Sequence, residues 1–331
     1  MDSRDRDIAL ADPTNDLSPT DLQALLTNLT PAVWQTSPWY QSSDSQPANR
    51  RQTTLEWLQH WCFLQSMGTS RARPQRVIND RQNGLSRSLT QNLHRANQGH
   101  GYWDDGWEIV QQLSDDCFQV VRNGLWVEVA PQHLPIRKRP YRVGDRVSIK
   151  LPKNLVVDDY YVAVGNAGLP QGACVELFFH LEAPAATPLI QNLTTTFNTA
   201  AKPLRLAMSH LQEAYPRRDV GILTITIDDY ALAHTALAAL YPELQPHLQP
   251  TVPLFSLPIA PGIGLLEVTA QPMQRYHCLA AALLRQHQAQ PAAPTITALL
   301  EQLETQFTAA GFTRDYWHCR ARTRRDYAPL N

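Results

Sequence analysis

The sequence predicts an α+β fold: a mainly antiparallel, twisted sheet with flanking helices and a helical N-terminal region. Apolar residues recur at helical spacing in the first quarter of the chain and again after residue 188, whereas they alternate with period two between residues 103 and 181. The 331 residues are 43% hydrophobic and 18% charged, which is enough apolar material to bury a substantial core. We therefore predict a helical region over residues 1–96 and an α+β body over residues 97–331.

Three helices are expected in the first region. The first begins at Ser18-Pro19, carries Leu22, Leu25, Leu26 and Leu29 on one face, and ends before Pro31. Residues 37–51 are rich in Ser, Gln and Pro, which predicts a loop before a second helix that holds residues 55–64. A third helix is expected over residues 86–96. The basic run 68–83 between them is either a phosphate-binding loop or a solvated loop.

The strands of the body begin with a hairpin. Residues 118–122 and 125–129 flank Asn123-Gly124, a dipeptide that suits a type I′ turn because both central residues need positive φ. Three more strands are expected at residues 146–151, 160–164 and 175–181. Together with the hairpin they predict an antiparallel meander. The second half continues with a helix at 188–199, strands at 204–208 and 220–227, a helix at 231–240, an extended segment at 252–268, and helices at 274–286 and 296–310.

Composition excludes several classes of function. The net charge is −1, so overall charge does not support nucleic-acid binding. Five scattered cysteines lack the spacing of a metal site and are expected to be reduced, which leaves the chain without a predicted metal. No signal peptide and no apolar run of the ~20 residues that span a bilayer is present, so we expect a cytoplasmic protein with no membrane contact.

Several short sequence motifs follow one another along the chain. In order they are Ala96–Trp107, with Asn97, Gly99, Gly106 and Trp107; Asn123-Gly124-Leu125; Gly144–Val147; Leu151–Asn154; Tyr160–Gly165; Tyr215–Asp219; Val252–Phe255; and Ala260–Leu265. In this order they resemble the HopA-type effector family, over about residues 93–284. That family contains secreted effectors of plant pathogens. It also contains proteins of lanthipeptide and thioamitide maturation that are similar to phospho-Ser/Thr lyases and work beside a kinase.

The resemblance implies elimination of phosphate from a phosphorylated peptide, with a kinase partner and without a metal or organic cofactor. Such a reaction requires a base for the Cα proton, cations for the phosphate and an acid for the leaving group. Only four lysines are present, so few residues could serve as a lysine base. We assign the candidates as follows: Arg205, Arg217 and Arg275 as phosphate ligands, Lys150 or Lys153 as the base, and His277 as the acid.

Each candidate also has a structural interpretation. Arg217 could pair with Asp219 to fasten a strand, Arg205 and the two lysines could be solvated, and His277 could be a structural histidine.

The sequence also departs from the family pattern. Glu176 stands in a strand where the family commonly carries an arginine, and a carboxylate there would repel phosphate. Ala207 replaces a common lysine, and residues 272–278 replace a serine-phenylalanine-glycine run. A second hypothesis is therefore a catalytically degenerate relative that grips a peptide or a kinase partner. A cationic pocket with a perturbed lysine or histidine would favour the lyase, and acidic surroundings at Glu176 would favour binding.

Overall fold

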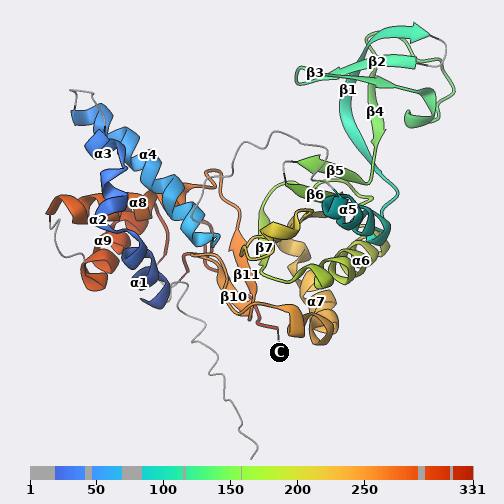
Figure 1. Cartoon of the computed structure of the whole chain (residues 1–331). Coiled ribbons are helices and arrows are strands. Elements are labelled where there is room, and N and C mark those ends of the chain that lie inside the picture. The colour runs from blue at the N-terminus through green and yellow to red at the C-terminus, as the bar shows by residue number, and fades with distance from the viewer. Residues whose placement is uncertain are drawn as a thin grey trace, which may run out of the picture.

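The computed structural model describes residues 19–41, 47–68, 84–114, 117–157, 159–289, 295–313 and 316–330. Its helices are α1 (Pro19–Asn28), α2 (Pro31–Gln35), α3 (Pro38–Gln41), α4 (Pro47–Ser66), α5 (Gly84–Ala96), α6 (Ala183–Thr199), α7 (Tyr230–Leu244), α8 (Gln274–Ala289) and α9 (Ile296–Ala309). Its strands are β1 (Tyr102–Ser114), β2 (Cys117–Arg122), β3 (Leu125–Val129), β4 (Arg146–Leu151), β5 (Asn154–Val157), β6 (Tyr160–Val164), β7 (Cys174–Phe179), β8 (Arg205–Ser209), β9 (Gly221–Thr226), β10 (Leu257–Ala260) and β11 (Ile263–Glu267). The predicted α+β class is confirmed (Figure 1).

Most elements lie where the sequence predicts them. The hairpin of β2 and β3 turns at Asn123 and Gly124, whose φ angles are 50° and 80° as a type I′ turn requires. Strands β4 and β6 have the predicted limits, and α5, α6, α8 and α9 begin or end within a few residues of theirs. The basic run 69–83 lies outside the described residues, so both interpretations of it stay predictions.

Two expectations were wrong. Residues 37–51 are not a continuous loop, because α3 and the first turn of α4 occupy parts of this range. The prolines that suggested a loop stand at Pro38 and Pro47, the first residues of these two helices, where the missing amide hydrogen costs nothing. The strands also do not form one meander. They divide into a four-stranded sheet with the order β3-β2-β1-β4 and a seven-stranded sheet with the order β10-β11-β7-β9-β8-β6-β5.

The seven-stranded sheet is the centre of the molecule, and one of its faces is fully covered. Alternate residues of its strands, such as Leu206, Leu223 and Leu177, pack with the apolar sides of α5, α6 and α7 in the largest hydrophobic cluster. Every pairing in this sheet is antiparallel. The opposite face is only partly covered and holds the candidate site described below.

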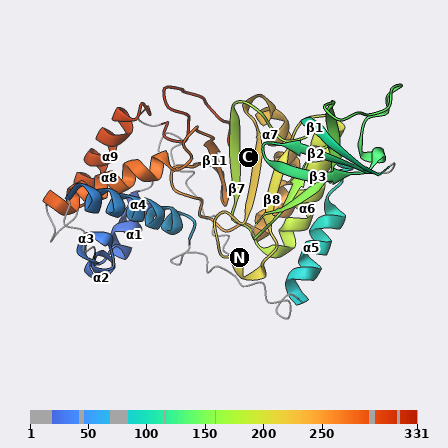
Figure 2. The ribbon, with the colours of Figure 1, turned by 90° about the horizontal axis from the view of Figure 1, so that it is seen from above.

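Helices α1–α4 do not pack on this covered face. Helix α4 contacts α8, and α1 contacts α9, so that residues from the two ends of the chain share a second hydrophobic cluster around Leu58 and Leu283. We call α1–α4 together with α8 and α9 the helical unit. Figure 2 shows it at one end of the molecule and the four-stranded sheet at the other, with the seven-stranded sheet between them. The division into domains at residue 96 stays a prediction. No helix within the described ranges is both long and apolar enough to cross a membrane.

Candidate functional site

Three polar residues form a row across the open face of the seven-stranded sheet. Arg205 on β8 pairs in register with Thr224 on β9, and Thr224 pairs with Glu176 on β7. Because residues directly opposite one another in a sheet project to the same side, the three side chains share one face. All three are partly exposed. We call Arg205, Thr224 and Glu176 the polar row.

Apolar side chains flank the polar row on both sides. Phe178 and Leu266 of the neighbouring strands β7 and β11 pack into the cluster of the helical unit. Val162 and Ala207 belong to a smaller cluster with Tyr102 from the base of the four-stranded sheet. The polar row therefore lies between the hydrophobic cluster of the helical unit and the cluster that contains Tyr102 of the four-stranded sheet.

The charges in the polar row oppose each other. Burial raises the pKa of the Glu176 carboxyl, and the nearby Arg205 guanidinium counteracts this rise. A carboxyl with a raised pKa retains its proton to higher pH than an exposed one, and in the protonated form Glu176 is a hydrogen-bond donor. Sequence reasoning identified Glu176 only as a departure from the family pattern. The register that sets it across from Arg205 could not be read from the sequence.

Arg217 lies toward one end of the same face and already has a partner. Its Nε and Nη2 atoms donate to the two carboxylate oxygens of Asp219 at 2.8 and 2.6 Å, and Nη2 also donates to the Tyr160 hydroxyl at 3.1 Å. Asp219 is 3% exposed, so this is a buried ion pair. The structural alternative for Arg217 is thus confirmed, and its role as a phosphate ligand stays a prediction. Tyr160 pairs with Ser209 on β8. Four residues of strand separate Ser209 from Arg205, so their backbones are about 13 Å apart.

The two candidate bases lie elsewhere. Lys153 donates from Nζ to the backbone carbonyls of His94 and Asn97 at 3.0 and 2.8 Å, where it caps the carboxyl end of α5. Asn97, which belongs to one of the motifs that resemble the family, donates a hydrogen bond from Nδ2 to the Lys153 carbonyl at 2.9 Å. Lys150 is exposed on β4 in the other sheet. Sequence spacing could not reveal that a lysine next to a strand serves as a helix cap.

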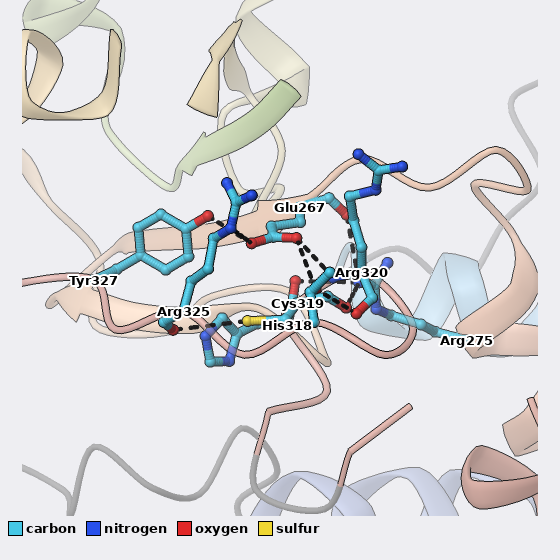
Figure 3. A network of polar contacts seen from close by, with 8 residues as sticks. Glu267, Arg275, His318, Cys319, Arg320, Arg325 and Tyr327 are labelled. Carbon is cyan, nitrogen blue, oxygen red and sulfur yellow. Dashed lines mark hydrogen bonds and ion pairs between the residues drawn. The ribbon is translucent and has the colours of Figure 1, made fainter. Parts of the chain in front are cut away.

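Arg275 is buried and hydrogen-bonded to backbone carbonyls in this fold, and its assignment as an anion clamp stays a prediction. It is 2% exposed, and its guanidinium donates to the backbone carbonyls of Trp317, His318 and Cys319 at 2.6, 3.1 and 2.6 Å. Figure 3 shows this contact beside Glu267, which is wholly buried and accepts hydrogen bonds from the Tyr327 hydroxyl and the Arg320 amide. The N–H donors of Arg275 are therefore directed at backbone carbonyls rather than at a ligand.

His277 is exposed on α8, where its Nδ1 lies 3.2 Å from the Gln59 side-chain oxygen of α4. The six candidates therefore do not gather at one point: Lys150, Lys153 and His277 lie away from the polar row, whereas Arg275, like Arg205, is near enough to counteract the rise that burial causes in the pKa of Glu176. Of the six, Arg205 is the one that belongs to the polar row. Within the described residues, no three His, Cys, Asp or Glu side chains gather as metal ligands.

Comparison with known proteins finds a family match over part of the chain. Residues 151–312 match the model of the HopA1 effector protein family. Two solved structures are similar to this chain: the effector protein from Pseudomonas syringae pv. tomato strain DC3000 (13% identity, 85% of this chain and 94% of that one, TM-score 0.42) and that from Pseudomonas syringae pv. syringae strain 61 (12% identity, 82% and 98%, TM-score 0.45). A search of curated proteins gives no match. The resemblance to the HopA-type effector family is thereby confirmed over residues 151–312.

Proposed function

We propose that this protein is a HopA-family peptide-binding module, and that its open sheet face holds the peptide at the polar row. The observation that carries the proposal is the alignment of Arg205, Thr224 and Glu176 on one face of three neighbouring strands. A guanidinium and a carboxyl on one face can meet the carbonyl oxygens and amide hydrogens of an extended peptide. The same pair suits a dianionic phosphate poorly, because an ionised Glu176 competes for Arg205 and repels the phosphate.

The surroundings support binding in preference to catalysis. The phosphate ligand expected at Arg217 is neutralised by Asp219, and Arg275 is enclosed by backbone carbonyls. The base is also absent from the polar row, since all four lysines are placed: Lys153 caps α5, Lys202 pairs with Asp229, and Lys138 and Lys150 are exposed between β3 and β5. A proton acceptor for the Cα hydrogen therefore has no lysine among its candidates here.

A phospho-Ser/Thr lyase is the second candidate, and one observation favours it. Phosphate elimination needs a cation for the phosphate and an acid for the leaving oxygen. Arg205 supplies a cation, and the raised pKa of Glu176 provides an acid beside it. In this hypothesis Glu176 replaces His277 as the acid, and the base is the group that an experiment would have to identify.

One experiment separates the two candidates. A library of phosphothreonine peptides and its unphosphorylated counterpart are incubated with the wild type and with Arg205→Ala, Glu176→Gln and Arg146→Ala. Arg146 is exposed on β4 and serves as the matched control for loss of an arginine. Binding is measured by fluorescence polarisation, and loss of phosphoric acid by mass spectrometry.

The binding proposal expects affinity to fall about tenfold in Arg205→Ala, to be unchanged in Arg146→Ala, and no peptide to lose phosphate. Phosphate loss that disappears in both Arg205→Ala and Glu176→Gln would establish the lyase and overturn the proposal. Absence of any binding that depends on Arg205 would reject the polar row as the site of either function.

A further inference from the structure

The four-stranded sheet has two edge strands whose outer sides are open. In the order β3-β2-β1-β4, strands β3 and β4 are terminal, and no described strand pairs with the outer side of either. The sheet projects from the rest of the molecule, as Figure 1 shows. Natural proteins shield such edges because unpaired backbone groups attract other strands. Here the β3 edge instead carries Leu125 and Trp126, which are 60% and 57% exposed.

The hairpin geometry identifies the open backbone groups. A two-residue type I′ turn is closed by a hydrogen-bonded pair, here Arg122 and Leu125. Hydrogen-bonded and non-hydrogen-bonded pairs alternate along an antiparallel ladder, so Trp126 and Glu128 occupy the non-hydrogen-bonded positions. Their amide and carbonyl groups therefore point away from β2, toward the open side of the strand.

A cavity of about 610 Å³ lies between the two edges. Residues 127–129 of β3 line one side and residues 149–151 of β4 line the other. His133 and His100 lie among its remaining lining residues. The two edges thus approach each other without pairing, and they enclose a space into which side chains of an added strand can project.

Positive charge is concentrated in the segment that leads into β4, the strand whose end lines the cavity. Residues 131–145 contain one acidic residue, Asp145, and four basic ones: Arg137, Lys138, Arg139 and Arg142. Arg137 is paired with Asp145, whereas Lys138, Arg139 and Arg142 are exposed. In a chain of net charge −1, this local excess of positive charge selects an acidic ligand.

We propose that the β3 edge binds an extended, acidic segment of a partner protein as an added strand, with alternate side chains over the cavity. The open groups of Trp126 and Glu128 supply the backbone hydrogen bonds, and the basic segment before β4 selects the charge of the ligand. The exposed Trp126 side chain can pack against apolar residues that alternate on one face of the added strand. A nucleic acid would use the basic residues but offers no backbone that can pair with a strand edge. This surface is separate from the polar row, so it can bind whether or not the polar row does.

The test uses the full chain and two substitutions at one position. Glu128→Pro removes an outward amide donor, and proline is tolerated where an edge-strand N–H faces solvent. Glu128→Gln removes the same charge but retains the donor, so it is the matched control. A phage-displayed library of random 12-residue peptides is selected on the wild type. Enriched peptides are then synthesised and measured by fluorescence polarisation against both variants and against Lys138→Glu/Arg139→Glu, with circular dichroism to verify folding.

The expected result is enrichment of acidic peptides with alternating apolar residues. Their affinity should fall about tenfold in Glu128→Pro and stay equal or rise in Glu128→Gln. In Lys138→Glu/Arg139→Glu the affinity should fall, and its dependence on salt should weaken. The proposal is overturned if no enriched peptide distinguishes Glu128→Pro from Glu128→Gln, or if a 20-nucleotide single-stranded DNA binds in place of peptides and loses affinity only in the charge-reversal variant.

Discussion

At the scale of single residues, the most constrained group is the buried guanidinium of Arg275. Its donors are directed at carbonyls of residues 317–319, which follow it by more than 40 positions in the chain. Arg275→Met retains most of the volume but leaves these carbonyls without partners, and we expect a loss of about 3 kcal/mol or more in the free energy of unfolding. Urea denaturation followed by tryptophan fluorescence would measure it. Arg285→Met, at an exposed position of the same helix, should be close to neutral, and equal stability of the two variants would contradict the structural role.

Sequence reasoning anticipated one of these residue roles and missed others. The pairing of Arg217 with Asp219 was an explicit alternative, because two residues so close in sequence define their own contact. Arg275 and Lys153 could not be interpreted correctly, because their acceptors are backbone carbonyls from distant segments. Backbone carbonyls occur at every position, so no residue pattern reveals them. Glu176 was noted for its charge, but its partner Arg205 became evident only from the register of β7, β9 and β8.

At the scale of elements, the contact of α2 and α3 with α8 should depend on pH. His287 of α8 stacks on Trp34 with ring centroids 3.9 Å apart, and its Nε2 lies 3.0 Å from the Tyr40 hydroxyl. Burial lowers the pKa of His287, so the docked state disfavours the protonated ring. The contact is therefore fully stable above the ordinary histidine pKa of about 6.5 and weakens as pH falls toward the lowered value.

Hydrogen exchange in residues 31–41 would measure this effect. Relative to His287→Phe, which can stack but cannot be protonated, the wild type should exchange faster at pH 5 and similarly at pH 7.5. A constant ratio across this range would show that protonation of His287 does not control the docking.

Element limits were predictable, whereas their pairing was not. Alternation with period two defined the limits of β4, which buries one face, and a short continuous apolar run defined those of β6, which buries both faces. The short strand β5 escaped notice between Lys153 and Asp158 because it spans only four residues. The separation into two sheets depends on β6 pairing with β8 and β7 pairing with β9, both across helix α6 or longer segments. Local sequence cannot choose among antiparallel partners so far apart.

At the scale of the whole molecule, the segment 317–330 joins the helical unit to the sheet. It contacts Arg275 of α8 and Glu267 of β11, and then reaches α7, where the Tyr230 hydroxyl donates to the Ala328 carbonyl at 2.8 Å. Tyr327 donates to the buried Glu267 carboxylate at 2.7 Å. Because Glu267 is fully buried and its hydrogen-bond donors come from this segment, we expect the sheet to depend on the segment for stability.

Tyr327→Phe tests this dependence with the loss of one oxygen atom. The substitution leaves a buried carboxylate without one donor, and we expect it to cost about 1–3 kcal/mol in the free energy of unfolding. Chemical denaturation would measure the change, with Tyr316→Phe, one residue before the segment, as the control. A Tyr327→Phe variant as stable as this control would indicate that the Glu267 network does not stabilise the joined state.

The position of this segment also has a consequence for synthesis. A ribosome adds residues 317–327 only after it has made the sheet and the helices that these residues connect. Until then, Glu267 has no tyrosine and Arg275 has no carbonyl cage, and two buried charges disfavour closure of the surrounding core. We therefore expect the core around Glu267 and Arg275 to close only after this segment has been made, so that a chaperone or a protease acting earlier would meet parts that are still separable.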